Sequence, residues 1–364
     1  MAKISEQITN EFKERIYKQF ALGYSLARTT VFAAQGALLP WIDFISTGER
    51  RASPKDYPEH LKQAIPKIHQ LLQKDIENIL NGFYPLDVLR PENPVTHGLR
   101  WPKVILDSIQ ASQRRHQKIH DQFNENSKEY LVDLPEYYKR NFHFQTDGYL
   151  GDKSAELYEH QVEILFSGAA DAMRRLIIPQ IKIHLQSLGY SESGEGVKFL
   201  ELGSGTGRLS KFVALAFPKA QLTCLDLSPT YLTKSKENLH PFKRINFIQS
   251  AAEKTPFKDE SFDVIFSCFL FHELPYEIRQ DVMKESLRLT KPQGMIAAVD
   301  SLQQDDDLDF QWALEQFPID FHEPFYKNYT LNSLADLWQD VGLKNVQIEK
   351  GFLAKSISGV KDSH

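Results

Sequence analysis

The sequence predicts an α/β protein: a doubly wound, mostly parallel seven-stranded sheet with a terminal antiparallel hairpin, preceded by an α-helical N-terminal domain. From residue 197 onward, short apolar runs alternate with amphipathic helical patterns, which is typical of parallel strands covered on both faces. The last two runs, 345–349 and 352–357, are too close together for a crossover helix and predict the hairpin. Before residue 150 the apolar spacing is helical.

The predicted strands and helices of the second half follow one another in order. The strands are expected at 197–202, 221–226, 245–249, 262–268, 294–300, 345–349 and 352–357. The helices are expected at 207–217, 229–239, 276–290 and 330–341, with a short turn near 251–255 and an interruption over 301–329.

The N-terminal half predicts helices over 4–39, from residue 58 to about 83, and over 103–124. The first carries an apolar stripe at Ile4, Ile8, Phe12, Ile16 and Phe20, which needs a partner surface to be buried. A long helix over 154–188, broken at Gly168 or Pro179, then leads into the sheet. We therefore expect a helical domain with an aromatic connector at 1–150 and a second domain at 151–364.

Composition narrows the class of protein. The chain has 364 residues, 41% of them hydrophobic, and a net charge of -5, so a soluble globular protein without a nucleic-acid or anionic-membrane surface is expected. No signal peptide is recognisable, and the stretch Val31 to Ile45 is too short to span a bilayer, so we predict a cytoplasmic location. Cys224 and Cys268 lie in predicted buried strands, which argues against a disulfide framework.

A glycine-rich turn, Gly203-Ser-Gly-Thr-Gly207, joins the first strand to the next helix. Glycine allows positive φ and lets a ligand approach the backbone, where the helix presents free N–H groups. A dinucleotide motif would have glycine where Arg208 stands, and no Gly-Lys-Ser/Thr of a P-loop follows. The alternative is that the turn only packs a strand against a helix.

Two acidic residues flank this turn. Asp226 ends the second strand, where a carboxylate can accept hydrogen bonds from both hydroxyls of a ribose. Glu201, two residues before the first glycine, could receive a cationic amino group. A ligand with a ribose and an amino-acid end fits these positions better than one with a pyrophosphate.

This stretch resembles motif I of the class I S-adenosylmethionine-dependent methyltransferases. The segments 252–265, 269–274 and 289–296 are similar to later parts of the ubiquinone/menaquinone-biosynthesis subgroup, so the resemblance covers residues 197–357. It implies S-adenosyl-L-methionine as the cofactor and a parallel sheet ending in a hairpin. Ala251 stands where the family often has an acid for the adenine amine, and Lys291-Pro-Gln-Gly294 departs from the usual turn.

Ligands of such sheets bind at the carboxyl ends of the strands. With the resemblance, this rule gives the expected cofactor-binding residues: Glu201, Gly203, Ser204, Gly205, Gly207, Asp226, Leu227, Ala252, Glu253 and Ser267.

His272 follows the fourth strand and is the candidate catalytic base, because its ordinary pKa suits proton transfer near pH 7. The alternative is a packing or helix-capping histidine. Glu273 is expected to be solvated or capping. The acidic run 305–309 lacks histidine, so it is not expected to bind metal, and no metal site is expected elsewhere in the chain. The candidate substrate contacts are His143, Tyr149, Phe271 and His322.

The sequence therefore predicts a methyltransferase that transfers a methyl group to a small, apolar or aromatic metabolite. The aromatic segments 130–149 and 317–326 are expected to close over the substrate as a lid. One alternative is a non-catalytic S-adenosylmethionine-binding module whose helical domain recruits a protein partner. A dinucleotide-dependent oxidoreductase is disfavoured by Arg208.

Overall fold

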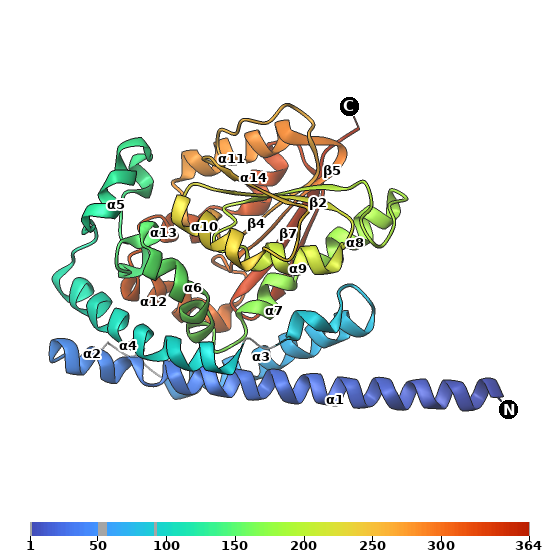
Figure 1. Ribbon diagram of the computed structural model, residues 1–364, viewed down its shortest axis with the longest axis horizontal. Helices are drawn as coiled ribbons and strands as arrows, with labels where there is room; N and C mark the ends of the chain where they lie inside the picture. The colour runs from blue at the N-terminus through green and yellow to red at the C-terminus, as the bar shows by residue number, and fades with distance from the viewer. Residues whose placement is uncertain (1, 50–56, 91–92, 364) are drawn as a thin grey trace.

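A computed structural model describes residues 2–49, 57–90 and 93–363, and Figure 1 shows a twisted sheet enclosed by helices. Within these residues the sheet has seven strands in the order β3-β2-β1-β4-β5-β7-β6. Strands β1 to β5 are parallel, and β7 is antiparallel to both of its neighbours, which confirms the predicted fold class. The strands are β1 (Lys198–Leu202), β2 (Gln221–Asp226), β3 (Ile245–Gln249), β4 (Phe262–Cys268), β5 (Thr290–Ser301), β6 (Lys344–Gly351) and β7 (Ala354–Val360).

The strand order reverses beside β1, whose neighbours are β2 on one side and β4 on the other. Leu202 pairs with Leu225 of β2 and with Ser267 of β4, so these strands end at a common edge. In open parallel sheets the crevice at such a reversal is the usual ligand site.

Two hydrophobic clusters cover the two faces of the sheet. One contains apolar side chains of α7 (Ala170–Arg175), α8 (Ile177–Ser187) and α9 (Arg208–Ala216). The other contains those of α11 (Tyr276–Leu289) and α14 (Leu334–Asp340), including the fully buried Trp338. Helix α10 (Pro229–Asn238) lies against β2 and β3. Alternating apolar strands and amphipathic helices thus bury both faces, as the sequence predicts.

The N-terminal helices are α1 (Ala2–Gly36), α2 (Leu39–Thr47), α3 (Tyr57–Leu80) and α4 (Pro94–Gln117). Helix α3 places Ile68, Leu71 and Leu72 in the same cluster as α7, α8 and one face of the sheet. Helix α1 runs along the side of the molecule, in contact with α3 and with α6 (Asp152–Leu165) (Figure 1). The helical region therefore shares a core with the sheet, and a domain division at residue 150 remains a proposal.

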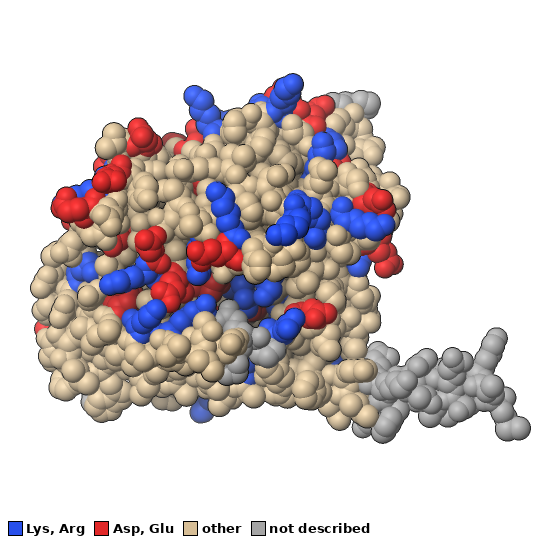
Figure 2. Space-filling view, viewed as in Figure 1, with Lys and Arg blue, Asp and Glu red and all other residues tan. Residues whose placement is uncertain are grey.

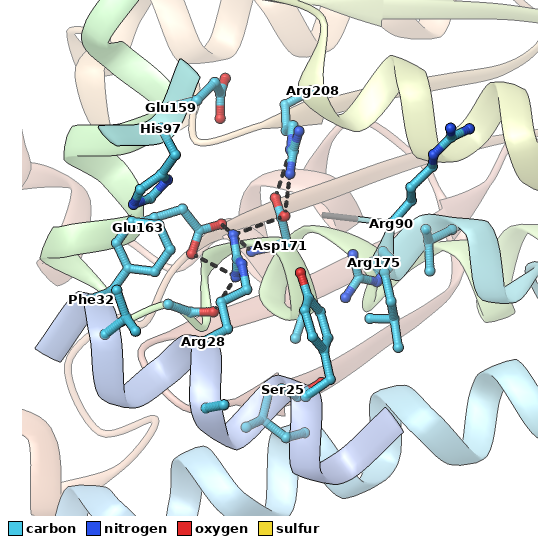
Figure 3. A pocket seen from close by; sticks show the side chains of 18 of the residues that line it. Ser25, Arg28, Phe32, Arg90, His97, Glu159, Glu163, Asp171, Arg175 and Arg208 are labelled. Atoms are coloured by element: carbon cyan, nitrogen blue, oxygen red, sulfur yellow. Dashed lines mark hydrogen bonds and ion pairs between the residues drawn. The ribbon is translucent and has the colours of Figure 1, made fainter. Parts of the chain in front are cut away.

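A cavity of about 370 Å³ lies between α1 and the helices that precede the sheet. Figure 3 shows its ion pairs: Arg28 of α1 reaches Glu163 and Asp171, and Arg208 binds Asp171 from the other side at 2.5 Å. Arg208 directly follows the glycine-rich turn. These contacts connect the first helix to the start of α9.

The predicted stripe of α1 is only partly described. The side chains of residues 2–15, among them Ile4, Ile8 and Phe12, lie outside the described part. Ile16 and Phe20 are 49% and 74% exposed, so this part of the stripe is not buried within the chain. The expectation that the stripe packs on the rest of the chain is wrong at these two positions.

Several predicted boundaries are corrected by the positions of prolines. Helix α4 begins at Pro94, not 103, because Asn93 caps it and proline is tolerated in a first turn; it also contains Pro102. Pro40 likewise lies in the first turn of α2, and the first helix already ends at Gly36 rather than at residue 39. The expected helix over 154–188 is three helices, with a break at Gly168 (φ 79°), while Pro179 lies in the first turn of α8.

The region after β5 and the hairpin also differ in detail. The segment 301–329, which we expected to interrupt the alternation of strands and helices, contains α12 (Gln311–Asp320) and the start of α13 (Tyr326–Leu331). Because α13 ends at Leu331, the helix expected at 330–341 begins only at Leu334, as α14. The hairpin turn is Phe352-Leu353 rather than Lys350-Gly351, because β6 extends to Gly351. Strand β5 begins at Thr290, four residues earlier than expected.

The described residues contain no helix long and apolar enough to cross a membrane. On the face shown in Figure 2, Lys and Arg side chains are interspersed with Asp and Glu side chains.

Candidate functional site

The glycine-rich turn has the backbone that the sequence predicts. Gly203, Gly205 and Gly207 have φ of 63°, 53° and 81°, and a Cβ at Gly207 would lie 2.5 Å from the Ser235 hydroxyl. Only glycine fits that position without displacement of its neighbours. The turn leads directly into α9, whose first residue is Arg208.

Asp226 at the end of β2 is tied to this turn. Its Oδ2 accepts a hydrogen bond from the Gly205 N–H at 2.7 Å, and its Oδ1 accepts one from the Ser228 N–H at 2.8 Å. Burial raises the pKa of Asp226 to about 6, although these N–H groups oppose the rise. The carboxylate is therefore fixed in orientation at the edge where β1 and β2 end.

A cavity of about 90 Å³, here called the cofactor cavity, opens at this edge of the sheet. Six of the ten predicted cofactor residues line it: Gly203, Gly205, Asp226, Leu227, Ala252 and Glu253. Its other walls include five tyrosines from distant parts of the chain, Tyr137, Tyr138, Tyr149, Tyr158 and Tyr231.

The remaining four predicted residues, Glu201, Ser204, Gly207 and Ser267, do not line this cavity. Glu201 is 1% exposed and accepts a hydrogen bond from the Ser210 hydroxyl of α9. Burial raises the pKa of Glu201 to about 8. The side chain thus faces the strand–helix interface, and a direct contact with a ligand amino group stays a prediction.

A second cavity, of about 180 Å³, is here called the acceptor cavity. Apolar and aromatic side chains from α6, the turn after β4 and α12 form most of its wall, including Phe166, Phe269, Phe317 and Tyr326. Tyr158, Phe269 and Glu273 line both cavities, so the two adjoin at these residues. His272 lies on the acceptor side of this junction.

His272 lies in the short helix η6 (Phe271–Glu273) that follows β4, and it is held by Asp300 at the end of β5. Its Nδ1 is 2.6 Å from Oδ1 of Asp300, a carboxylate that also accepts the N–H groups of Phe271 and Ser301. Burial opposes the charged imidazolium, but the Asp300 carboxylate outweighs it and raises the pKa of His272 to about 9. The His272 imidazole is therefore protonated at neutral pH. Its raised pKa differs from the ordinary histidine pKa that we expected from the sequence.

Glu273 is neither solvated nor a helix cap, contrary to the expectation from the sequence. Its side chain is 12% exposed and accepts a hydrogen bond from the Tyr149 hydroxyl at 2.5 Å. Burial, followed by the charge of Glu323, raises its pKa to about 7. Tyr149 lies in η5 (Gly148–Leu150), so this bond joins the aromatic segment to the end of β4.

His143 in η4 (Phe142–Phe144) joins the same segment to the loop after α12. Its Nε2 lies 2.6 Å from Oε1 of Glu323, whose side chain is fully buried. Burial disfavours the imidazolium, yet the Glu323 carboxylate raises the pKa of His143. The two segments that we expected to form a lid therefore meet at an ion pair beside the acceptor cavity.

The candidate substrate contacts fall into two pairs. His143 lines the acceptor cavity and Tyr149 the cofactor cavity. Phe271 is buried in the hydrophobic cluster on the α11 side of the sheet. The ring of His322 stacks on that of His120, with the ring centroids 4.3 Å apart. Neither Phe271 nor His322 lines the cofactor cavity or the acceptor cavity. Nothing in the sequence marked Asp300 as the partner of His272, and nothing marked Glu323 at all.

Three side chains beside the acceptor cavity could hold a metal ion. His143, Glu273 and Glu323 each offer one ligand atom, and these atoms lie within 4.8 Å of one another. The acidic run 305–309, in contrast, pairs with lysines: Asp306 with Lys355 and Asp309 with Lys67.

Comparison with known proteins identifies the family of the sheet region. Residues 199–294 match the family described as a methyltransferase domain. Over these residues the chain carries a methyltransferase domain. The matched residues contain the glycine-rich turn, Asp226, His272 and Glu273, so the domain supplies one wall of both cavities.

Among curated proteins, the chain is 32% identical over 105 residues to a ubiquinone/menaquinone biosynthesis C-methyltransferase of Shewanella sediminis, covering 28% of this chain and 41% of that protein. It is 27% identical over 161 residues to that of Pseudomonas savastanoi, covering 42% and 62%. The chain thus spans between about two fifths and three fifths of these relatives.

Solved structures with a similar fold include an O-methyltransferase family protein from Burkholderia thailandensis, with 18% identity, a TM-score of 0.40, and coverage of 58% of this chain and 63% of that one. A protein described as a putative sarcosine dimethylglycine methyltransferase from Galdieria sulphuraria has 17% identity, a TM-score of 0.40, and coverage of 53% and 87%.

Proposed function

We propose that this chain is an S-adenosylmethionine-dependent methyltransferase whose acceptor is a small molecule with an apolar or aromatic body. The single observation that carries the proposal is the junction of the two cavities at Tyr158, Phe269 and Glu273. A methyl donor on the Asp226 side and an acceptor on the His272 side would meet there.

The cofactor side fits the ribose of S-adenosylmethionine. Asp226 is buried, fixed by two N–H groups, and lines the cofactor cavity together with Gly203 and Gly205. A carboxylate at the end of β2 accepts ribose hydroxyls, and the glycines leave room for the ligand against the backbone. Leu227 and Ala252 offer apolar surface for the adenine.

The acceptor side fits an aromatic or apolar molecule. Its wall is rich in phenylalanine and tyrosine, and it carries fewer polar side chains, among them His272, Glu273 and Asp320. Such a cavity binds an apolar body and orients it through a small number of polar contacts. Closure of the segments around His143 and Glu323 would exclude water and align the acceptor.

Bound S-adenosylmethionine supplies an electrophilic methyl group, so the protein needs mainly to align the acceptor and to take a proton where the acceptor carries one. His272 is the proposed proton acceptor. Asp300 holds its Nδ1, which fixes the ring and leaves Nε2 for the acceptor. Because His272 is protonated in the empty site, we expect it to act once the cationic cofactor has bound and disfavoured the imidazolium.

The test uses S-adenosylmethionine with an isotopically labelled methyl group and a small-molecule extract. The purified protein should move the label into at least one small molecule, detected by mass spectrometry as a one-methyl increase. His272→Gln should reduce this transfer, while Glu195→Gln, an exposed side chain just before β1 that lines neither cavity, should not. Cofactor binding without any labelled product would instead support a binding module.

A further inference from the structure

We propose that His143, Glu273 and Glu323 bind one divalent transition-metal ion at the edge of the acceptor cavity. The ion would hold an oxygen atom of the acceptor molecule; this second part rests on the proposed methyltransferase function, whereas the metal site itself does not.

The three ligand atoms converge from separate segments. His143 comes from the aromatic segment, Glu273 from the turn after β4, and Glu323 from the loop after α12. All three atoms lie within 4.8 Å of one another. Metal–ligand bonds of about 2.1 Å place neighbouring ligand atoms roughly 3 Å apart, so small side-chain rotations would complete the site.

A second observation points to a missing ligand. The Glu323 side chain is fully buried, and neither of its oxygens has a hydrogen-bond partner among the described residues. The Nε2 of His143 also lacks one, although it lies 2.6 Å from Oε1 of Glu323. The two atoms are close but not aligned as donor and acceptor. Buried polar atoms in this state call for an ion or a water, and atoms that face a common point are what a shared cation requires.

The charges near the site agree with a cation. Three buried carboxylates, those of Asp300, Glu273 and Glu323, share the two imidazoles of His272 and His143. Two buried carboxylates at close range repel each other. A divalent ion bound to both, with His143 neutral, would balance their two charges.

The composition of the set indicates which ions would bind. One imidazole and two carboxylates suit Mn²⁺, Fe²⁺ or Zn²⁺ better than Mg²⁺ or Ca²⁺, which prefer oxygen ligands alone. His143 and Glu273 also line the acceptor cavity, so open coordination positions would face the acceptor. An acceptor with a hydroxyl or carboxylate oxygen is therefore the chemical class that this site would select.

The first experiment measures metal binding without S-adenosylmethionine, so its failure is separate from any failure of methyl transfer. The full chain is freed of metal with a chelator and titrated with Mn²⁺, and free Mn²⁺ is followed by electron paramagnetic resonance. We expect one Mn²⁺ per chain, displaced by Zn²⁺ but not by equal Mg²⁺. The pulsed spectrum should show coupling to an imidazole nitrogen.

Three variants locate the site. Glu323→Gln and His143→Asn should each weaken Mn²⁺ binding at least tenfold; asparagine suits position 143 because the backbone there has a φ of 54°. Asp320→Asn removes a carboxylate that lines the same cavity outside the set, and it should bind Mn²⁺ as the wild type does. Thermal melting of each variant checks its fold.

Two results would overturn the proposal. The first is that the wild-type protein binds neither Mn²⁺ nor Zn²⁺ in a defined ratio. His143 and Glu323 would then form a buried ion pair without a metal ion. The other is Mn²⁺ that binds without imidazole coupling, or equally well in Glu323→Gln and His143→Asn, which would place the ion elsewhere.

Discussion

The Nδ1 of His272 lies 2.6 Å from Oδ1 of Asp300, so the histidine after β4 is oriented by the acid that ends β5. The N–H groups of Phe271 and Ser301 fix the same carboxylate at 2.7 and 2.8 Å. Two backbone segments, η6 and the end of β5, thus determine how one imidazole meets the acceptor cavity. Asp300 is a positioning residue because it acts through His272.

The first prediction concerns this pair. Asp300→Asn should lower kcat roughly a hundredfold, with a small change in KM, because the imidazole loses its fixed orientation. His272→Gln should cause a similar loss. If the residues act as one unit, the double variant should be no slower than either single one, and steady-state kinetics of the four proteins would show it. Additive losses would contradict a shared role.

The second prediction concerns the pH dependence of cofactor binding. The ionised Asp226 carboxylate accepts ribose hydroxyls, and burial raises the pKa of Asp226 to about 6. Affinity should therefore be constant near pH 7 and fall as the pH drops through 6, approaching tenfold per pH unit below it. Calorimetric titrations between pH 5 and 7 avoid the titration of Glu201, whose pKa is raised to about 8. Another group of this cavity that titrates near this range is Glu273, whose pKa is raised to about 7. In Asp226→Asn the dependence should disappear; its persistence would assign it to another group.

The third prediction concerns the joint between the N-terminal helices and the sheet region. Arg175 of α7 binds Asp75 of α3 through two hydrogen bonds of 2.8 and 2.6 Å, and both side chains are buried. Asp75→Asn should lower the free energy of unfolding by about 3–5 kcal/mol, because it leaves a buried guanidinium without its counter-charge. Denaturant unfolding would measure this loss.

A matched control for the third prediction is the exposed pair of Lys62 and Glu59, whose side chains are 74% and 60% exposed. Glu59→Gln should cost less than about 1 kcal/mol. Equal effects of the two substitutions would show that α3 is not held to the sheet region by the buried pair.

The sequence predicted those features that depend on local spacing. The glycine-rich turn, Asp226 at the end of β2 and His272 after β4 all follow from the alternation of strands and helices, and the structure places them as that pattern requires. The fold class could be predicted for the same reason. Helix breaks were harder to place, since proline in a first turn starts a helix whereas proline elsewhere interrupts one.

The rest of the candidate site depends on contacts between distant segments. Tyr149 and Glu273 are 124 positions apart, and no local pattern announces their hydrogen bond. Glu273 was expected to be solvated or capping, as charged residues usually are, yet packing of the aromatic segment buries it. Glu323 lies in an irregular loop without any motif. Such residues can be found only once the chain is folded.

We infer that the cavity beside Asp226 holds S-adenosylmethionine. Isothermal titration calorimetry of the purified full chain measures this binding, with NAD as the competing ligand class. We expect one S-adenosylmethionine per chain, no measurable NAD binding, and an affinity about ten- to hundredfold weaker in Asp226→Ala. Absence of S-adenosylmethionine binding by the wild type, or tighter binding of NAD, would contradict it.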